Sequence, residues 1–187
     1  MADESGEVRT KKLDPEAEAR RRLALAQIRQ YPDPVLRMQA NDVEQFDGDL
    51  EKLVERLEHL LGEASGLGLA ATQIGVLRRV FVFLPDQEGE PVVVVNPRFT
   101  VTSEERESDT EGCLSLQGVV IPVERHASVV VEGKDAEGKD VRLELEGLPA
   151  RIAQHELDHL DGVLILDRTT PEGRREALGI LRQSVPV

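Results

Sequence analysis

The segment 154–159, QHELDH, restricts the fold of this chain more than any other part of its sequence. Residues four positions apart lie on the same side of an α-helix, so His155 and His159 can direct their imidazoles at one metal ion if this segment is helical. Glu156 can then lean over the same side without ligating the ion. This arrangement is typical of zinc hydrolases, in which the glutamate takes a proton from a water molecule. The segment therefore predicts a helix that carries a metal site.

An ordinary amphipathic helix with surface histidines is the alternative interpretation of this segment. Ile152 shares one helical face with His155, Glu156 and His159, so an apolar stripe continues into a polar group. Burying polar side chains is unfavourable unless they have partners. A metal ion would supply such a partner, and we therefore favour the metal site.

Two imidazoles leave a tetrahedral metal ion short of at least one protein ligand. Downstream of His159 the chain offers Asp161, Asp167 and Glu172 but no further histidine. The only cysteine, Cys113, lies upstream in the segment 111–115, EGCLS, and can be interpreted as a buried small residue, a reactive thiol or a metal ligand. A thiolate is a strong ligand for Fe(II) or Zn(II), and we favour the ligand because the histidine pair needs one.

Composition excludes several classes of protein. With 187 residues, the chain is long enough for one compact domain. Its residues are 40% hydrophobic and 32% charged, a composition typical of a globular protein. A net charge of -13 argues against direct binding to nucleic acid, and no apolar run approaches the ~20 residues of a membrane span. The first residues resemble neither a secretory signal nor a transit peptide, and a single cysteine allows no internal disulfide. We therefore expect a cytoplasmic protein without a membrane partner.

Hydrophobic periodicity predicts helices on both sides of a block of strands. One helix is expected over 47–63, a second from Pro149 to a stop at Gly162, and a third over 170–182. The strands between them are separated by turn sequences, as in antiparallel hairpins. They are expected at 79–84, 91–96, 98–102, 119–123, 128–132 and 141–145.

This order predicts an α+β fold: antiparallel β-sheets packed around a central metal-binding helix, with an N-terminal helix and a short C-terminal helix. Residues 1–25 are charged and poor in large apolar side chains. We interpret them as a solvated extension outside the catalytic core, with a helix starting at Pro15. Residues 26–187 then form a single catalytic domain.

Three segments in this order resemble the peptide deformylase family. They are 66–73, GLGLAATQ, followed by 111–115, EGCLS, and 154–159, QHELDH. The segment 31–37, YPDPVLR, is also similar to the family, and the resemblance covers about residues 28–182. The spacing and periodicity of the residues alone predict only a metal-dependent hydrolase; the family is indicated by the three matching segments.

The resemblance implies a role for each matched residue. Cys113, His155 and His159 would bind one divalent metal, usually Fe(II) and replaceable by Zn(II), Ni(II) or Co(II). Glu156 would act as the general base and then protonate the departing amine. Gln73 and the backbone N–H of Leu114 would polarise the formyl oxygen.

The implied reaction removes the formyl group, as formate, from N-formylmethionyl peptides emerging from the ribosome. Nascent peptides, and transiently the ribosome itself, would therefore be its partners. Glycines without side chains let an extended peptide approach the backbone. The expected substrate-binding residues are Gly66, Leu67, Gly68, Gly112, Leu148 and Ile152. The segment 116–121, LQGVVI, departs from the family pattern, whereas Arg125 matches it and is expected to pair with Glu111.

Two other functions compete with this one. A zinc endopeptidase using the same helix would take its third ligand downstream of His159 and tolerate Cys113→Ser. A non-enzymatic binding module would keep the helix for structure alone and hold no stoichiometric metal.

Overall fold

A computed structural model describes residues 14–86 and 89–183 of the chain. The helices are α1 (Pro15–Leu25), α2 (Gly48–Ala64), α3 (Leu148–Leu160), α4 (Ile165–Arg168) and α5 (Pro171–Gln183), with short 3-10 turns at Pro34–Arg37 and Ala71–Ile74. The strands are β1 (Gly68–Ala70), β2 (Val80–Phe83), β3 (Val92–Thr102), β4 (Arg106–Cys113), β5 (Leu116–His126), β6 (Ser128–Lys134) and β7 (Asp140–Glu146). None of the described helices is long and apolar enough to cross a membrane.

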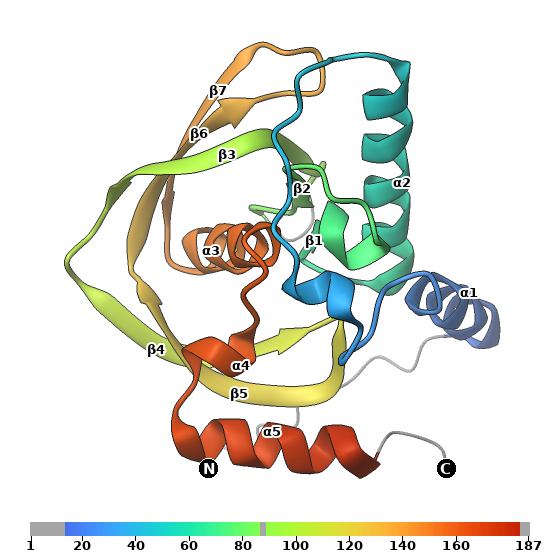
Figure 1. Ribbon diagram of the computed structural model, residues 1–187, viewed down its shortest axis with the longest axis vertical. Helices are drawn as coiled ribbons and strands as arrows, with labels where there is room; N and C mark the ends of the chain where they lie inside the picture. Colours follow the sequence, from blue (N-terminus) through green and yellow to red (C-terminus); the bar gives the residue numbers. More distant parts are fainter. Residues whose placement is uncertain (1–13, 87–88, 184–187) are drawn as a thin grey trace, which may run out of the picture.

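The strands form two antiparallel sheets around α3, which confirms the expected α+β class. One sheet has the order β1-β2-β3-β6-β7, and β4 and β5 form a separate hairpin. In Figure 1, α3 lies in the middle of the molecule, with β3 and β6 curving past it and β5 running between α3 and α5. The metal-binding motif therefore lies on the element that the sheets enclose.

Helix α3 begins and ends where its sequence requires. Gly147 precedes it at a positive φ of 62°, and Pro149 falls in its first turn, where a missing N–H is tolerated. Ile152, Ala153 and Leu160 join the core cluster against the five-stranded sheet. Gly162 follows at φ 72°, in the left-handed region that favours glycine. The helix predicted from Pro149 to a stop at Gly162 is thus confirmed, and it begins one residue earlier, at Leu148.

A second core cluster joins α2 to the edge of the same sheet and includes part of α1. Helix α1 starts at Pro15, as predicted, and Asp14 caps it by accepting from the N–H of Ala17. Ala24 is only 3% exposed and packs in this cluster, so the last turn of α1 is not solvated as we expected. The division of the chain at residue 25 stays a prediction, and residues 1–13 lie outside the described ranges.

The strand predictions differ from the structure at three places, of which the first is the three-residue strand β1, not expected within the glycine-rich segment 66–73. Strands expected at 91–96 and 98–102 are one strand, β3, because the irregularity at Asn96 is a bulge with φ 51° rather than a strand end. The Asn96 side chain accepts from the N–H of Val43 at 2.7 Å and donates to its carbonyl at 2.9 Å. Strand β4 was not expected at all, because its sequence RESDTEGC is polar and mostly exposed.

The tight turn after α3 generates a stability prediction. A Cβ at Gly162 would lie 2.6 Å from the carbonyl oxygen of Arg37, in addition to the strain of positive φ. Gly162→Ala should therefore lower the free energy of unfolding by about 1–3 kcal/mol in a denaturant titration.

Gly62→Ala is the matched control, since Gly62 lies within α2 and a Cβ there meets nothing within 4 Å. This variant should gain about 0.5–1 kcal/mol. Equal stability of the two variants would contradict the assigned backbone constraint.

Candidate metal centre

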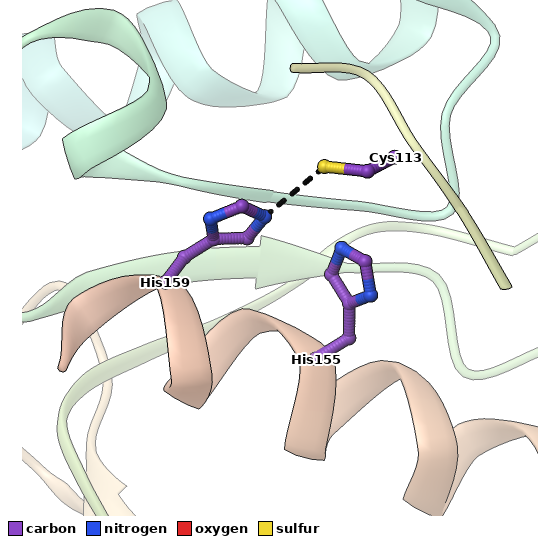
Figure 2. A group of neighbouring side chains, drawn as sticks. All are labelled: Cys113, His155 and His159. Atoms are coloured by element: carbon purple, nitrogen blue, oxygen red, sulfur yellow. Dashed lines mark hydrogen bonds between the residues drawn. The ribbon is translucent and has the colours of Figure 1, made fainter. Parts of the chain in front are cut away.

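Three potential ligands converge at the centre of the molecule. His155 and His159 project from α3, and Cys113 is the last residue of β4. Their donor atoms all lie within 4.8 Å of one another, and Cys113 Sγ is 3.3 Å from His159 Nε2. Figure 2 shows the three side chains pointing toward a common point.

The arrangement fits a metal ion. Donors around a tetrahedral ion with bonds of ~2.0–2.3 Å are separated by about 3.4–3.6 Å, close to the 3.3 Å between Cys113 Sγ and His159 Nε2. A thiolate with two imidazoles suits borderline divalent ions such as iron and zinc. Among the described residues, the three that the sequence singled out form a group that could hold a metal ion.

The carboxylate of Glu111 orients one of these ligands. Its Oε2 accepts from His155 Nδ1 at 2.9 Å, which leaves Nε2 of the same ring as the donor to a metal. Burial alone would raise the pKa of Glu111, but hydrogen bonds from His155 and Arg125 hold that pKa well below its usual range. Glu111 therefore stays ionised and keeps His155 in one tautomer and one orientation.

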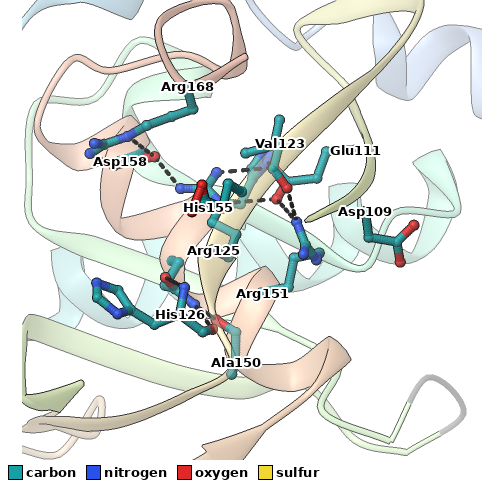
Figure 3. A network of polar contacts seen from close by, with 12 residues as sticks. Asp109, Glu111, Val123, Arg125, His126, Ala150, Arg151, His155, Asp158 and Arg168 are labelled. Atoms are coloured by element: carbon teal, nitrogen blue, oxygen red, sulfur yellow. Dashed lines mark hydrogen bonds and ion pairs between the residues drawn. The ribbon is translucent and has the colours of Figure 1, made fainter. Parts of the chain in front are cut away.

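Glu111 belongs to a buried network of charges, drawn in Figure 3. Arg125 donates to both Glu111 oxygens, at 2.9 and 3.0 Å, which confirms the pairing expected from the sequence. Its third nitrogen donates to Asp158 at 2.5 Å. Arg151 adds a bond of 2.8 Å to Glu111, and Arg168 one of 2.6 Å to Asp158. The network thereby ties β4, β5 and α3 together behind the ligands.

Three members of this network were not expected from the sequence: Arg151, Asp158 and Arg168. Asp158 lies inside the motif itself, but its burial, at 6% exposed, and its resulting need for a cationic partner are visible only in the structure. Nothing in local spacing shows that this partner comes from α4.

Glu156 lies on the cavity side of α3 in a very different environment. It is 3% exposed, and its Oε2 has no hydrogen-bond partner within the described residues. Burial raises the pKa of Glu156 to about 7, and the negative charge of Glu111 acts in the same direction, while His155 opposes it. A carboxylate with such a pKa can take up and release a proton near neutral pH.

The glycines of the segment 66–73 make room for protein side chains. A Cβ at Gly68 would overlap Glu156, lying 2.7 Å from its Cδ and closer still to Oε1. A Cβ at Gly66 would lie 2.8 Å from Leu114 Cδ1. The sequence suggested that these glycines admit a peptide, and the structure adds that Gly68 is required by the position of Glu156.

Gln73 is held beside the ligands by the turn Ala71–Ile74. Its side-chain oxygen accepts from the N–H of Ala70 at 2.9 Å, and its Nε2 donates to Ser115 Oγ at 3.1 Å. The same Nε2 is 3.8 Å from Cys113 Sγ. Leu114 follows Cys113 directly, and its carbonyl accepts from Gln30 at 2.9 Å. Both residues expected to polarise the substrate therefore lie next to the metal ligands.

A cavity of about 560 Å³ opens onto this group. Every substrate-binding residue expected from the sequence lines it, as do Gln73, Cys113, Leu114, His155 and Glu156. The expected residues are Gly66, Leu67, Gly68, Gly112, Leu148 and Ile152. His159 is 2% exposed and does not line the cavity. Arg21 and Leu25 of α1 line it as well, although the sequence placed them outside the core.

The buried network generates a prediction about metal affinity. Glu111→Gln removes a negative charge. That charge orients His155 and compensates the positive charges of Arg125 and Arg151. Metal affinity should fall about 10–100-fold, and stability by about 3–5 kcal/mol. Competition with a chelator and a denaturant titration measure the two effects.

Glu124→Gln is the matched control. Glu124 is an exposed residue of β5 whose ion pair with Arg106 is at the surface. Its loss should change stability by less than about 0.5 kcal/mol and leave metal affinity unchanged. Equal metal affinities of the two variants would contradict the orienting role of Glu111.

Comparison with known proteins agrees with this geometry. The family model for polypeptide deformylase matches residues 25–175. A peptide deformylase of Desulforudis audaxviator is 44% identical over 154 residues, which cover 82% of this chain and 99% of that protein. The residues that the family model matches include all of the segments that form the centre.

Solved structures show the same fold. The crystal structure of a peptide deformylase from Legionella pneumophila superposes with a TM-score of 0.80 at 37% identity, covering 83% of this chain and 92% of the other. That of the peptide deformylase from Thermotoga maritima gives a TM-score of 0.74 at 43% identity, covering 77% and 97%. The fold, the central group of ligands and the sequence matches agree, and this chain belongs to the polypeptide deformylase family.

Proposed function

We propose that this protein hydrolyses the formyl group from the N-terminal formylmethionine of newly made polypeptides and releases formate. The observation that carries the proposal is the cysteine–histidine–histidine group beside the buried Glu156, whose Oε2 has no hydrogen-bond partner among the described residues, at a cavity large enough for part of a peptide. Family membership supports the same reaction.

Cys113, His155 and His159 are the proposed ligands of one divalent metal. Fe(II) is the proposed native ion, with Zn(II), Ni(II) and Co(II) as replacements, because one thiolate and two imidazoles are acceptable to all four. When bound, such an ion supplies Lewis-acid activation of water and of a carbonyl oxygen. Glu111 keeps the His155 ring oriented for this purpose through its bond to Nδ1.

Glu156 is the proposed general base and acid. Its carboxylate accepts a proton from water as the water oxygen bonds to the formyl carbon. The same carboxyl group then gives that proton to the amine nitrogen as the C–N bond breaks, and formate and a free amine leave. A pKa near 7 and the absence of a competing hydrogen bond on Oε2 in the described structure suit both steps.

Gln73 and the backbone N–H of Leu114 are the proposed donors to the formyl oxygen. The side chain of Gln73 is fixed by Ala70 and Ser115, so its amide group requires little reorganisation. Donors fixed in this way and directed at a developing oxyanion typically contribute ~2.7–4 kcal/mol each.

The peptide is proposed to bind along β1. In the described part of the chain this strand pairs only with β2, at the edge of its sheet, and its first residue, Gly68, lines the cavity. An extended chain can therefore add to its free edge through backbone hydrogen bonds. Leu67, Leu148 and Ile152 would surround the methionine side chain. Leu67 and Leu148 are 37% and 38% exposed at the cavity. An apolar side chain bound there would cover this exposed apolar surface.

The endopeptidase alternative is not favoured. Its third ligand would come from downstream of His159, where Asp161 instead pairs with Arg79 at 2.6 Å and Asp167 pairs with Arg37. The donor that does approach the histidines is Cys113. Substrates are therefore proposed to be formylated nascent chains. A transient contact with the ribosome and a cytoplasmic location are parts of the same proposal.

Substitution of the base and of one ligand tests the reaction. The anaerobically purified, Fe(II)-loaded protein should release formate from formyl-Met-Ala-Ser. Glu156→Ala should retain the metal and lose at least about 100-fold in kcat, the lower end of the contribution of a general base. Cys113→Ser should lose metal together with activity.

Absence of formate release by the wild-type protein would refute the proposed function. Full activity of Cys113→Ser would favour the endopeptidase type of site instead. A coupled formate assay and elemental analysis of each variant distinguish these results.

The contact between Gly68 and Glu156 gives an independent test. Gly68→Ala should displace the carboxylate by a fraction of an ångström or more and lower kcat about 100-fold, because misplacement on this scale is costly in a preorganised site. Metal content should not change.

Gly48→Ala is the control for this substitution. A Cβ at Gly48, the first residue of α2, meets nothing within 4 Å. Both kcat and metal content should match the wild-type values. An unchanged kcat in Gly68→Ala would show that Glu156 does not act from its observed position.

A further inference from the structure

Helix α1 brings an arginine to the cavity that holds the ligands. Arg21 and Leu25 lie one turn apart on α1, and both line the cavity. Arg21 Nε donates to the carbonyl oxygen of Ala64, the last residue of α2, at 3.2 Å. This bond holds the guanidinium at one end of the segment 64–68. Glu156 is packed against Gly68 at the other end.

Arg21 differs from the other charged residues that line the cavity. It is exposed, whereas Arg151 is buried and donates to Glu111 and to the carbonyls of Val123 and Glu107. Arg21 forms no ion pair within residues 14–86 and 89–183, although its neighbour Arg20 pairs with Glu63. Its terminal nitrogens are therefore available to a ligand in the cavity.

The number of peptide residues that separate Glu156 from Arg21 can be counted along β1. A peptide on the free edge of β1 advances about 3.3 Å per residue. If its first residue reacts beside Gly68, its third residue lies beside Gly66, next to the end of the segment where Arg21 is held. Side chains one and three of a strand lie on the same face. A third side chain therefore faces the cavity together with the methionine.

We propose that Arg21 selects an acidic side chain at the third position of the formylated peptide. This inference rests on the proposed deformylase function and goes beyond it by naming a residue that determines specificity. A guanidinium binds a carboxylate through two charge-assisted hydrogen bonds. Because Arg21 is exposed, the preference is modest, about three-fold, and decreases as salt screens the charges.

The test compares amide-capped peptides, so that a free C-terminal carboxylate does not compete. The peptides are formyl-Met-Ala-Asp-amide, formyl-Met-Ala-Asn-amide and formyl-Met-Ala-Lys-amide. The wild-type, metal-loaded protein should give a kcat/KM ratio of about three for Asp over Asn at low salt, approaching one at roughly 1 M salt. Arg21→Ala should bring the ratio to one, and Arg21→Glu should favour the Lys peptide.

Arg22→Ala is the matched control. Arg22 is the next residue of α1, is exposed, and does not line this cavity. It should keep the wild-type ratio, although it removes the same charge from a protein of net charge -13. The comparison therefore separates a local contact from a change in overall charge.

The ratio also separates recognition from structure. Loss of the bond to Ala64 in Arg21→Ala would lower kcat/KM for all three peptides equally, whereas recognition changes the ratio between them. An Asp/Asn ratio that is the same in the wild type and in Arg21→Ala would overturn the inference while leaving the deformylase function intact. Failure of the wild type to deformylate any of the peptides would instead refute the function itself, and the inference with it.

Discussion

The carboxylate of Glu111 is the interaction on which the centre depends. It is buried on β4, accepts from Arg125 on β5, and accepts from Arg151 and His155 on α3. Removing one partner from a buried ion network is far more costly than losing a surface ion pair. Because Cys113 lies two residues further along the same strand, the contacts that fix Glu111 also fix the thiol relative to the histidines. The network is therefore part of the site as well as of the fold.

Two glutamates near the ligands have carboxyl pKa values that are shifted in opposite directions. Glu111 is surrounded by cations, and its pKa lies far below the usual range. Glu156 is equally buried but has an oxygen without a partner in the described structure, and its pKa is raised to about 7. Environments that separate two carboxyl pKa values in this way assign different roles to the groups. One glutamate positions a ligand, and the other is suited to move a proton.

The sequence was sufficient for the parts of this structure that depend on local geometry. The helical positions of His155 and His159 follow from their spacing, and Cys113 was identified because two histidines alone make an incomplete site. Strand β4 was missed because it is formed by pairing with β5 and carries little apolar periodicity. The contacts of Asp158 with Arg168, and of Arg21 with the cavity, depend on tertiary packing between distant segments, which no local pattern encodes.

X-ray absorption spectroscopy of the zinc-loaded protein tests the central claim most directly. The account predicts one sulfur ligand at ~2.3 Å and two imidazole nitrogens at ~2.0–2.1 Å. Cys113 is the only cysteine in the chain, so a thiolate signal can come from no other residue of the protein. A coordination shell of nitrogen and oxygen alone would show that Cys113 is not a ligand and would contradict the account.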